Sequence, residues 1–491
     1  MKIRIIATIL LIIGYSVLST AQNQTPTRQY NASLFGIKSD GVTMNTRSIQ
    51  KALDWISEQG GGELTFWVGR YLTGSVHLRS NVSIRLLEGA VLEGSANPYD
   101  YDKICGTYAL VIGEKCDHVA IVGKGNIIGH GRELGNNFAQ QVHAGILKDA
   151  LKYDRVSSRP RLIYLRECNH IEIQDVTLKD AAEWVQTYDQ CTDVVVDHIF
   201  VESCAYWNND GIDIVDCNGF LLKNSYFNSS DDAICLKSHS KDALCQNVEV
   251  RNCTARSSAN GIKLGTFGLG GFKNIRIIGN TVYNTYRSAI TIQSVDGGIC
   301  EDILVDSLTA NNVGNPIYIV VGDRRRPAGK ISTMKNITVR NVTCTVPATK
   351  ADAGYEYEGP IEDNPRNISP SSVVGLPESH IENVVLENIM LNYPGGGDSM
   401  VARVRPDELD RVPEMPKAYP EFSQFKELPA WGFFVRHVDG ISFKNIRLTA
   451  QKSDYRLPVV LDDVKSASFD KISAQMSGNT VSDENLIFER H

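Results

Sequence analysis

The sequence predicts an all-β chain folded as a right-handed parallel β-helix, a solenoid of stacked coils. Short alternating strand patterns recur along most of the chain, and examples are "HIEIQDVTL", "NVEVRNCTA" and "NITVRNVTC". Strands of period two with a β-branched face indicate β-coils rather than helices. The middle copies follow one another at a step of roughly 23 to 34 residues, which is typical of solenoids. Such a unit cannot bury its apolar face alone, so neighbouring coils are expected to stack into one core.

The first 21 residues predict a secretory signal peptide. They hold two cations, Lys2 and Arg4, then an apolar run, then the small residues Ser19-Thr20-Ala21. Removing this segment takes the net charge from -7 to about -9, because both cations are lost. No second long apolar run follows, so we expect a secreted or periplasmic protein with no membrane partner.

Residues 22–80 are expected to form an N-terminal cap and the first coils. The stretch "MNTRSIQKALDWISEQGG" has Asn45 or Thr46 as N-cap, apolar residues at helical spacing and a Gly stop. A helix here would cover the open end of the solenoid, where strand edges are otherwise exposed. Residues 81–491 are predicted to form the parallel β-helix domain. The segment from about 345 to 435, rich in Pro, Glu and Tyr, is interpreted as long loops crossing one face, with disorder as the alternative.

The composition of the chain argues against several classes of function. The chain has a pI near 5.9 and no strongly basic face, which argues against a nucleic-acid partner. Its 11 cysteines are either buried free thiols or disulfides, and their spacing does not decide between the two. No Cys/His cluster indicates a metal site, and no cofactor is expected. We expect a monomer.

Four aspartates stand out in "NNDGIDIVDC" and "NSSDDAICLKS": Asp210, Asp213, Asp231 and Asp232. Asp210 and Asp231 are 21 residues apart, about one coil, so they are expected on neighbouring rungs roughly 5 Å apart. Like charges at this range raise at least one pKa, which provides a proton donor beside ionised groups that can activate water. Three other interpretations remain: incidental turn residues, a calcium site, and, for Asp213, a buried structural carboxylate.

These stretches resemble a known family. "FGIKSDGVTMNTRSIQKALD", "NNDGID" at 208–213 and "SSDDAICLKS" at 229–238 are similar to the motifs of the polygalacturonase-like glycoside hydrolases, family 28. The resemblance runs over nearly the whole mature chain and implies a metal-independent, inverting hydrolase with a β-helix fold. It implies Asp231 as the general acid and Asp210 with Asp232 as the pair that activates water. Asn208 and Lys237 would support them.

Two further motifs of that family are absent. Where Gly-His-Gly is usual, the chain reads "ANGIKLGT", with Asn260 at the His position and Lys263 added. Where Arg-Ile-Lys is usual, it reads "YRSAITIQS", with apolar Ile290 and Ile292 and only Arg287 nearby. Asn260, Lys263 and Arg287 are therefore candidate substrate-binding residues. Lys263 and Arg287 either take the place of the absent Arg-Ile-Lys in binding a sugar carboxylate or simply neutralise the aspartates.

Other candidates are weaker. The resemblance places Trp184 near the cleft, where it either stacks on a sugar face or packs in the core. A literal Gly-His-Gly at 129–131 contains His130, which we do not assign a catalytic role. The run Arg324 to Arg326 either binds an acidic glycan or solvates a turn.

The sequence thus predicts a pectin hydrolase cleaving α-galacturonosyl linkages in rhamnogalacturonan or galacturonate oligomers, with acidic polysaccharide or oligosaccharide as its partner. Two alternatives remain open. One is a Ca²⁺-dependent polysaccharide lyase using Lys263 or Arg287 as base, and the other is a non-catalytic, glycan-binding β-helix.

Overall fold

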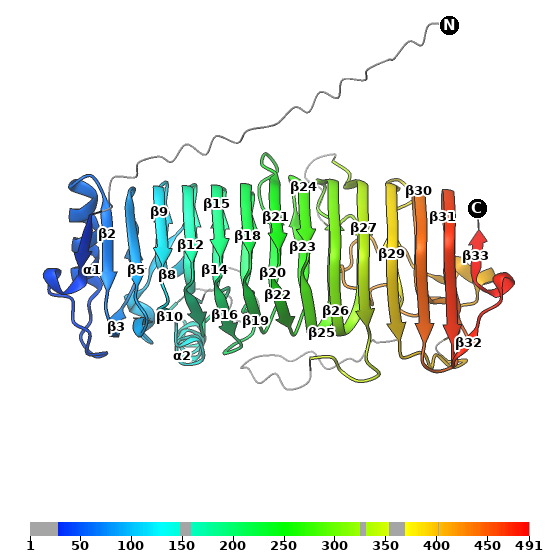
Figure 1. Ribbon diagram of the computed structural model, residues 1–491, viewed down its shortest axis with the longest axis horizontal. Coiled ribbons are helices and arrows are strands. Elements are labelled where there is room, and N and C mark those ends of the chain that lie inside the picture. Colours follow the sequence, from blue (N-terminus) through cyan, green and yellow to red (C-terminus); the bar gives the residue numbers. More distant parts are fainter. Residues whose placement is uncertain (1–27, 148–158, 325–329, 353–368, 401, 491) are drawn as a thin grey trace, which may run out of the picture.

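The computed structural model describes residues 28–147, 159–324, 330–352, 369–400 and 402–490, and they form the predicted right-handed parallel β-helix. Figure 1 shows the coils stacked along one axis, with the described chain beginning at one end and finishing at the other. Nearly every strand pairs in parallel with the strand one coil away. The predicted signal peptide, Arg325 and Arg326 lie outside the described residues.

Three stacked sheets form the walls of the helix. Sheet 1 contains β4 (Val76–His77), β8 (Thr107–Glu114), β11 (Arg161–Arg166), β14 (Gln186–Asp189), β17 (Ile212–Val215), β20 (Ile234–Ser238), β23 (Ile262–Gly268), β28 (Ser371–Val374) and β33 (Ile487–Arg490). Sheet 2 contains β1 (Gln29–Asn31), β2 (Gly62–Phe66), β5 (Val82–Leu86), β9 (Asp117–Val122), β12 (Asn169–Gln174), β15 (Thr192–Asp197), β18 (Asn218–Lys223), β21 (Cys245–Arg251) and β24 (Gly271–Ile278).

Sheet 3 contains β3 (Gly69–Thr73), β6 (Ala90–Gly94), β10 (Asn126–Ile128), β13 (Thr177–Lys179), β16 (Phe200–Ser203), β19 (Tyr226–Ser229) and β22 (Thr254–Ser257). Later strands are longer and bend from one sheet into the next: β25 (Thr281–Ser294), β26 (Ile299–Val321), β27 (Thr333–Thr345), β29 (Ile381–Tyr393), β30 (Ala430–Ala450) and β31 (Leu457–Met476). The short strands β7 (Asp102–Ile104) and β32 (Asn479–Thr480) pair antiparallel with β8 and β31.

Aliphatic side chains of equivalent positions stack inside the solenoid. In sheet 2, for example, Val196, Leu222 and Val250 lie on successive coils and are fully buried. The turns between sheets use left-handed backbone, which Asn tolerates better than most residues. Asn247 and Asn274 adopt it and form a ladder, in which each side-chain amide donates to the residue one coil earlier at 2.7 Å. The Asn-rich turns of the sequence therefore serve the stacking.

Helix α1 (Thr46–Glu58) covers the first coil, as predicted, and buries Ile49, Leu53 and Ile56. Asn45 occupies the N-cap position, but its side chain bonds to the backbone of Lys38 instead of capping the helix. A second helix, α2 (Gly131–His143), was not predicted. It buries Leu134 and Phe138 and lies outside the coils beside β10 (Figure 1).

The segment from about 345 to 435 does not consist of long loops alone, which corrects the prediction. Strands β28 and β29 lie within it and continue the stack by pairing with β26, β27 and β30. The chain between β29 and β30, which we call the late loop (residues 394–400 and 402–429), packs on the outer face of sheet 1. Its contacts form a second apolar core outside the solenoid: Val295, Tyr318, Val320, Val374, Val404, Leu409, Val412, Phe422, Phe425, Leu428, Ala430, Phe434 and Val460.

All 11 cysteines are free thiols, most of them buried, which decides between the two interpretations of the sequence. Among the residues that the structure describes, no helix is long and apolar enough to cross a membrane.

Candidate active site

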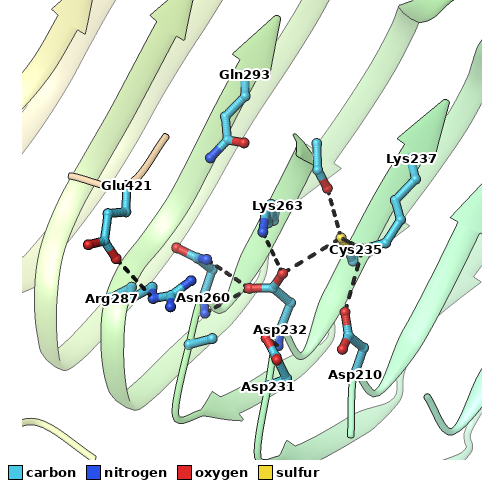
Figure 2. Close-up of polar contacts among 12 residues, drawn as sticks. Asp210, Asp231, Asp232, Cys235, Lys237, Asn260, Lys263, Arg287, Gln293 and Glu421 are labelled. Atoms are coloured by element: carbon cyan, nitrogen blue, oxygen red, sulfur yellow. Dashed lines mark hydrogen bonds and ion pairs between the residues drawn. The ribbon is translucent and has the colours of Figure 1, made fainter. Parts of the chain in front are cut away.

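Stacking brings the three acids of the motif together on the outer face of sheet 1. Asp210 precedes β17, and Asp231 with Asp232 precedes β20, one coil further on. The amide of Gly211 donates to the carbonyl of Asp232 at 2.9 Å, which fixes the two turns side by side. One carboxylate oxygen from each of the three acids lies within 4.8 Å of the others (Figure 2).

Asp231 is the most accessible of the three, being half-buried while Asp210 and Asp232 are buried. Asn208 donates to its Oδ2 at 3.0 Å, and the amide of Asp232 donates to its Oδ1 at 2.8 Å. Burial, and then the charge of Asp232, raise the pKa of Asp231. The most accessible of the three carboxyls, that of Asp231, thus keeps its proton to a higher pH than an ordinary aspartate.

Asp232 has the opposite environment. Lys263 Nζ lies 2.7 Å from its Oδ2, and Asn260 donates to its Oδ1 through the backbone amide at 3.1 Å and through the side chain at 2.7 Å. Burial alone would raise the pKa of Asp232, but the positive charges of Lys263, Lys237 and Arg287 hold it well below its usual range. Asp232 is therefore ionised.

Asp210 and Asp213 share one cation. Lys237 Nζ is 2.9 Å from Asp213 Oδ1 and 3.5 Å from Asp210 Oδ2. Burial, and then the nearby Asp231 and Asp213, raise the pKa of Asp210 well above its usual value, while burial raises the pKa of Asp213 to about 6 against the pull of Lys237. Asp213 is fully buried, as the structural interpretation expects.

Lys237 also donates to the sulfur of Cys235 at 2.8 Å, and the Cys235 sulfur lies between Lys237 and Asp232 in Figure 2. Although burial lowers the pKa of Lys237, the surrounding acids, Asp213 first, hold it above its usual value. Cys235 is a neighbour of the site that sequence reasoning did not single out, because it occupies an apolar position in "DAICLKS".

The late loop supplies two side chains that the sequence did not assign to the site. Lys263 Nζ donates to the hydroxyl of Tyr419 at 3.3 Å, and Arg287 Nε lies 3.4 Å from Glu421 Oε2. The Arg287 guanidinium is 5.8 Å from the centre of the Tyr419 ring. Gln293 anchors this part of the loop by donating to the carbonyl of Pro420 at 2.8 Å. The loop was predicted to cross one face, but nothing in the sequence indicated which of its residues reach the acids.

Trp184 lies beside the acids and is half-buried. The Lys237 ammonium is 4.6 Å and the Arg161 guanidinium 4.1 Å from the centre of its ring, distances typical of cation–π contacts. Arg161, on an earlier coil, and His239, which follows β20, help to line a surface pocket of about 410 Å³. Trp184 thus contacts both Arg161, which lines this pocket, and Lys237, which pairs with the acids.

Two other candidates lie elsewhere. His130 Nε2 is 2.7 Å from Glu93, which also binds Arg70, so it belongs to an ion-pair network of the early coils. Arg324 Nη2 is 3.0 Å from the buried Asp296. Its contact is with a structural carboxylate of the chain.

Fold and site together define a class of protein. Carboxylates held in different protonation states, side by side on an accessible surface, are the groups that glycosidases use as acid and base. The sequence model described as "Glycosyl hydrolases family 28" matches residues 67–355, and the chain belongs to this family of pectin-degrading glycoside hydrolases, which hydrolyse O-glycosyl bonds.

Similar proteins include an exo-poly-alpha-D-galacturonosidase of Dickeya chrysanthemi, 26% identical over 73% of this chain and 71% of that protein. An exopolygalacturonase from Thermotoga maritima has a TM-score of 0.59 at 20% identity, covering 75% of this chain and 88% of that one. A family 28 exopolygalacturonase from Yersinia enterocolitica has a TM-score of 0.56 at 17% identity, covering 94% and 77%. These two structures share the fold.

Proposed function

We propose that the protein is a secreted hydrolase that cleaves terminal α-galacturonosyl linkages of pectin fragments by inversion. Asp231 protonates the leaving oxygen, and Asp210 with Asp232 holds the attacking water. Asp232 is the ionised member of this pair and accepts the proton of the water. The observation that carries this assignment is the difference between neighbouring carboxyls: the pKa of Asp231 is raised and that of Asp232 is lowered. An acid and a base therefore coexist at one pH.

Asp210 offers a position for the attacking water. Within the described part of the chain, its buried Oδ1 meets no hydrogen-bond donor, and a buried oxygen of this kind is usually satisfied by an ordered water. The acids are closer together than the roughly 6.5–9.5 Å common in inverting enzymes. Inversion is therefore proposed from the family resemblance, and the anomeric configuration of the first product tests it.

Attack at a chain end is supported by the late loop. Its apolar core covers the outer face of sheet 1 on the coils after β23, and Tyr419 and Glu421 stand against Lys263 and Arg287. A polymer lying along sheet 1 would meet this barrier directly after the acids. The Dickeya, Thermotoga and Yersinia proteins are also named as exo-acting enzymes.

The substrate is proposed to be a galacturonate oligomer or a rhamnose-containing pectin fragment. Lys263 and Arg287 both lie near Tyr419 and close to the acids, and their positive charges can attract a sugar carboxylate. Ile290 and Ile292 point into the solenoid core, so this coil offers no cation at the place of the usual Arg-Ile-Lys.

The two alternatives fit less well. A lyase needs a base, but Lys263 is held by Asp232 with a pKa raised above its usual value, so it is protonated. Two lysines already compensate the carboxylates that a Ca²⁺ ion would need. A purely binding protein would carry a cluster of buried like charges, which lowers stability, without using them.

The test is turnover of polygalacturonate, rhamnogalacturonan and galacturonate oligomers by the wild type and by Asp231→Asn. The account predicts saturated products, single sugars released from oligomer ends, and a loss of about 10²- to 10⁴-fold in kcat for the variant. Asp242→Asn, at an exposed carboxylate paired with Lys241, is the matched control and should retain full activity. Ultraviolet-absorbing, unsaturated products would indicate a lyase, and binding without any product would indicate a binding protein.

A further inference from the structure

We propose that His380, His437 and Asp463 form a binding site for a divalent transition metal such as Zn²⁺, separate from the carboxylate cluster. His437 lies on β30 and Asp463 on β31, while His380 directly precedes β29. These strands lie near the C-terminal end of the solenoid in Figure 1, several coils beyond β17 and β20.

Three donor atoms converge at this point. His437 Nδ1 is 2.7 Å and His380 Nε2 is 3.2 Å from the same oxygen of Asp463, Oδ2. All three atoms lie within 4.8 Å of one another. Residues His437 and Asp463 both adopt left-handed backbone in equivalent turns of neighbouring coils, which aims their side chains outward on the same side. The convergence is thus produced by the stacking.

The outer nitrogen of each ring has a carboxylate partner. His380 Nδ1 is 2.7 Å from Asp439, and His437 Nε2 is 3.1 Å from Glu414. A neutral imidazole has one N–H and one lone pair. With the N–H directed to Asp439 or Glu414, each ring turns its lone pair toward Asp463. This carboxylate–histidine arrangement orients histidines at metal sites and raises their basicity.

The donor set and geometry fit a zinc-class ion. Imidazole nitrogen and carboxylate oxygen are ligands of Zn²⁺ with bonds of about 2.0–2.2 Å, which in a tetrahedron separates ligand atoms by about 3.3 Å. The 3.2 Å contact already meets this value, and the 2.7 Å contact needs a side-chain shift of about half an ångström. The side chain of Asp463 is 43% exposed, so a water molecule can complete the coordination.

A metal bound here would stabilise the position of the late loop. Glu414 belongs to that loop, and its other oxygen is 3.2 Å from the buried Arg436, which also donates to the loop carbonyls of Leu409 and Val412. A cation that fixes His437 also fixes its partner Glu414. The site would therefore hold the start of the segment whose Tyr419 and Glu421 reach the proposed active site.

The experiment uses the full mature chain, freed of metal by EDTA and dialysis, and titrated with ZnCl₂ by calorimetry and with Co²⁺ by visible absorption. We expect a single equivalent of Zn²⁺, a tetrahedral Co²⁺ spectrum and a Tm that rises with bound metal. His437→Gln and His380→Gln should abolish this binding, and Glu414→Gln should weaken it by about 10- to 100-fold. His198→Gln, at an exposed His–Asp pair, is the matched control.

Absence of Zn²⁺ binding by the wild type would overturn the proposal and leave a hydrogen-bonded histidine–carboxylate cluster. Unchanged binding in both histidine variants would also overturn it and place the metal elsewhere, for example at the exposed Asp117, His118 and His170. The wild-type titration does not depend on the folding of any variant or on enzymatic activity.

Discussion

The outer face of sheet 1 differs between the middle coils and the later coils. On β17, β20 and β23 it carries Asp213, Lys237 and Lys263, and the acids lie in the adjoining turns. On β26, β28 and β30 the equivalent face is mostly apolar, with Tyr318, Val374 and Phe434 covered by the late loop, and the buried Arg436 is its charged exception. The same backbone thus provides a polar surface in one place and a packing surface in the other.

This difference shows how a regular solenoid acquires a local site. The inward-facing residues are equivalent in both regions, so the fold is indifferent to what the outer face carries. Buried charges on the middle coils are stabilised by their partners alone, whereas the later coils gain stability from apolar contact with the loop. The loop joins the two regions, because Tyr419 and Glu421 contact Lys263 and Arg287.

The largest effect on the stability of the whole solenoid is expected from removing the cation of the middle coils. Lys237→Met leaves Asp210 and Asp213 buried without their shared partner, so the free energy of unfolding should fall by about 3–5 kcal/mol. Lys241→Met removes an exposed ion pair and should cost at most about 1 kcal/mol. Chemical denaturation of both variants measures the difference, and equal stabilities would show that the buried acids do not depend on Lys237.

A loss of stability confined to the late loop is expected from a substitution in the second core. Phe422→Ala opens a cavity in the second core at a cost of about 3–5 kcal/mol. Because this core is separate from the solenoid core, the late loop should lose hydrogen-exchange protection while the coils keep theirs. Phe433→Ala, at a fully buried residue of the solenoid, should instead weaken the neighbouring coils. Identical exchange patterns in the two variants would mean that loop and coils unfold together.

A smaller effect is expected from the charge of Lys263. Lys263→Gln keeps a hydrogen-bond donor near Asp232 but removes the positive charge that contributes to its low pKa. The pKa of Asp232 should rise, so a higher pH is needed to ionise it, and the acid limb of kcat/KM should move to higher pH. Lys223→Met, far from the acids, serves as the control. An unchanged acid limb would mean that the ionisation of Asp232 does not control kcat/KM at low pH.

The sequence predicted the coils and the carboxylate cluster because both depend on spacing. Residues about one coil apart become neighbours in a solenoid, so Asp210, Asp231 and Asp232 were brought together by counting alone. Tyr419 could not be found in this way. It lies 156 residues beyond Lys263 and reaches it only because the second core positions the late loop.

Two other features were missed for related reasons. Helix α2 begins within the Gly-His-Gly at 129–131 and was not predicted, although Leu134 and Phe138 have helical spacing. The histidine cluster has no sequence motif, because His380, His437 and Asp463 come from three elements of unequal spacing. Only the stacking of the late coils brings them together.

The central claim is that neighbouring acids in different protonation states hydrolyse the glycosidic bond with inversion. The most direct measurement is proton NMR of the first product formed by the wild type from a galacturonate oligomer, recorded before the released sugar mutarotates. The account predicts a saturated galacturonate whose new anomeric centre is β, opposite to the α-linkage that is cleaved. An α-anomer would indicate a covalent, retaining reaction, and it would contradict the assignment of Asp210 and Asp232 as the residues that activate water.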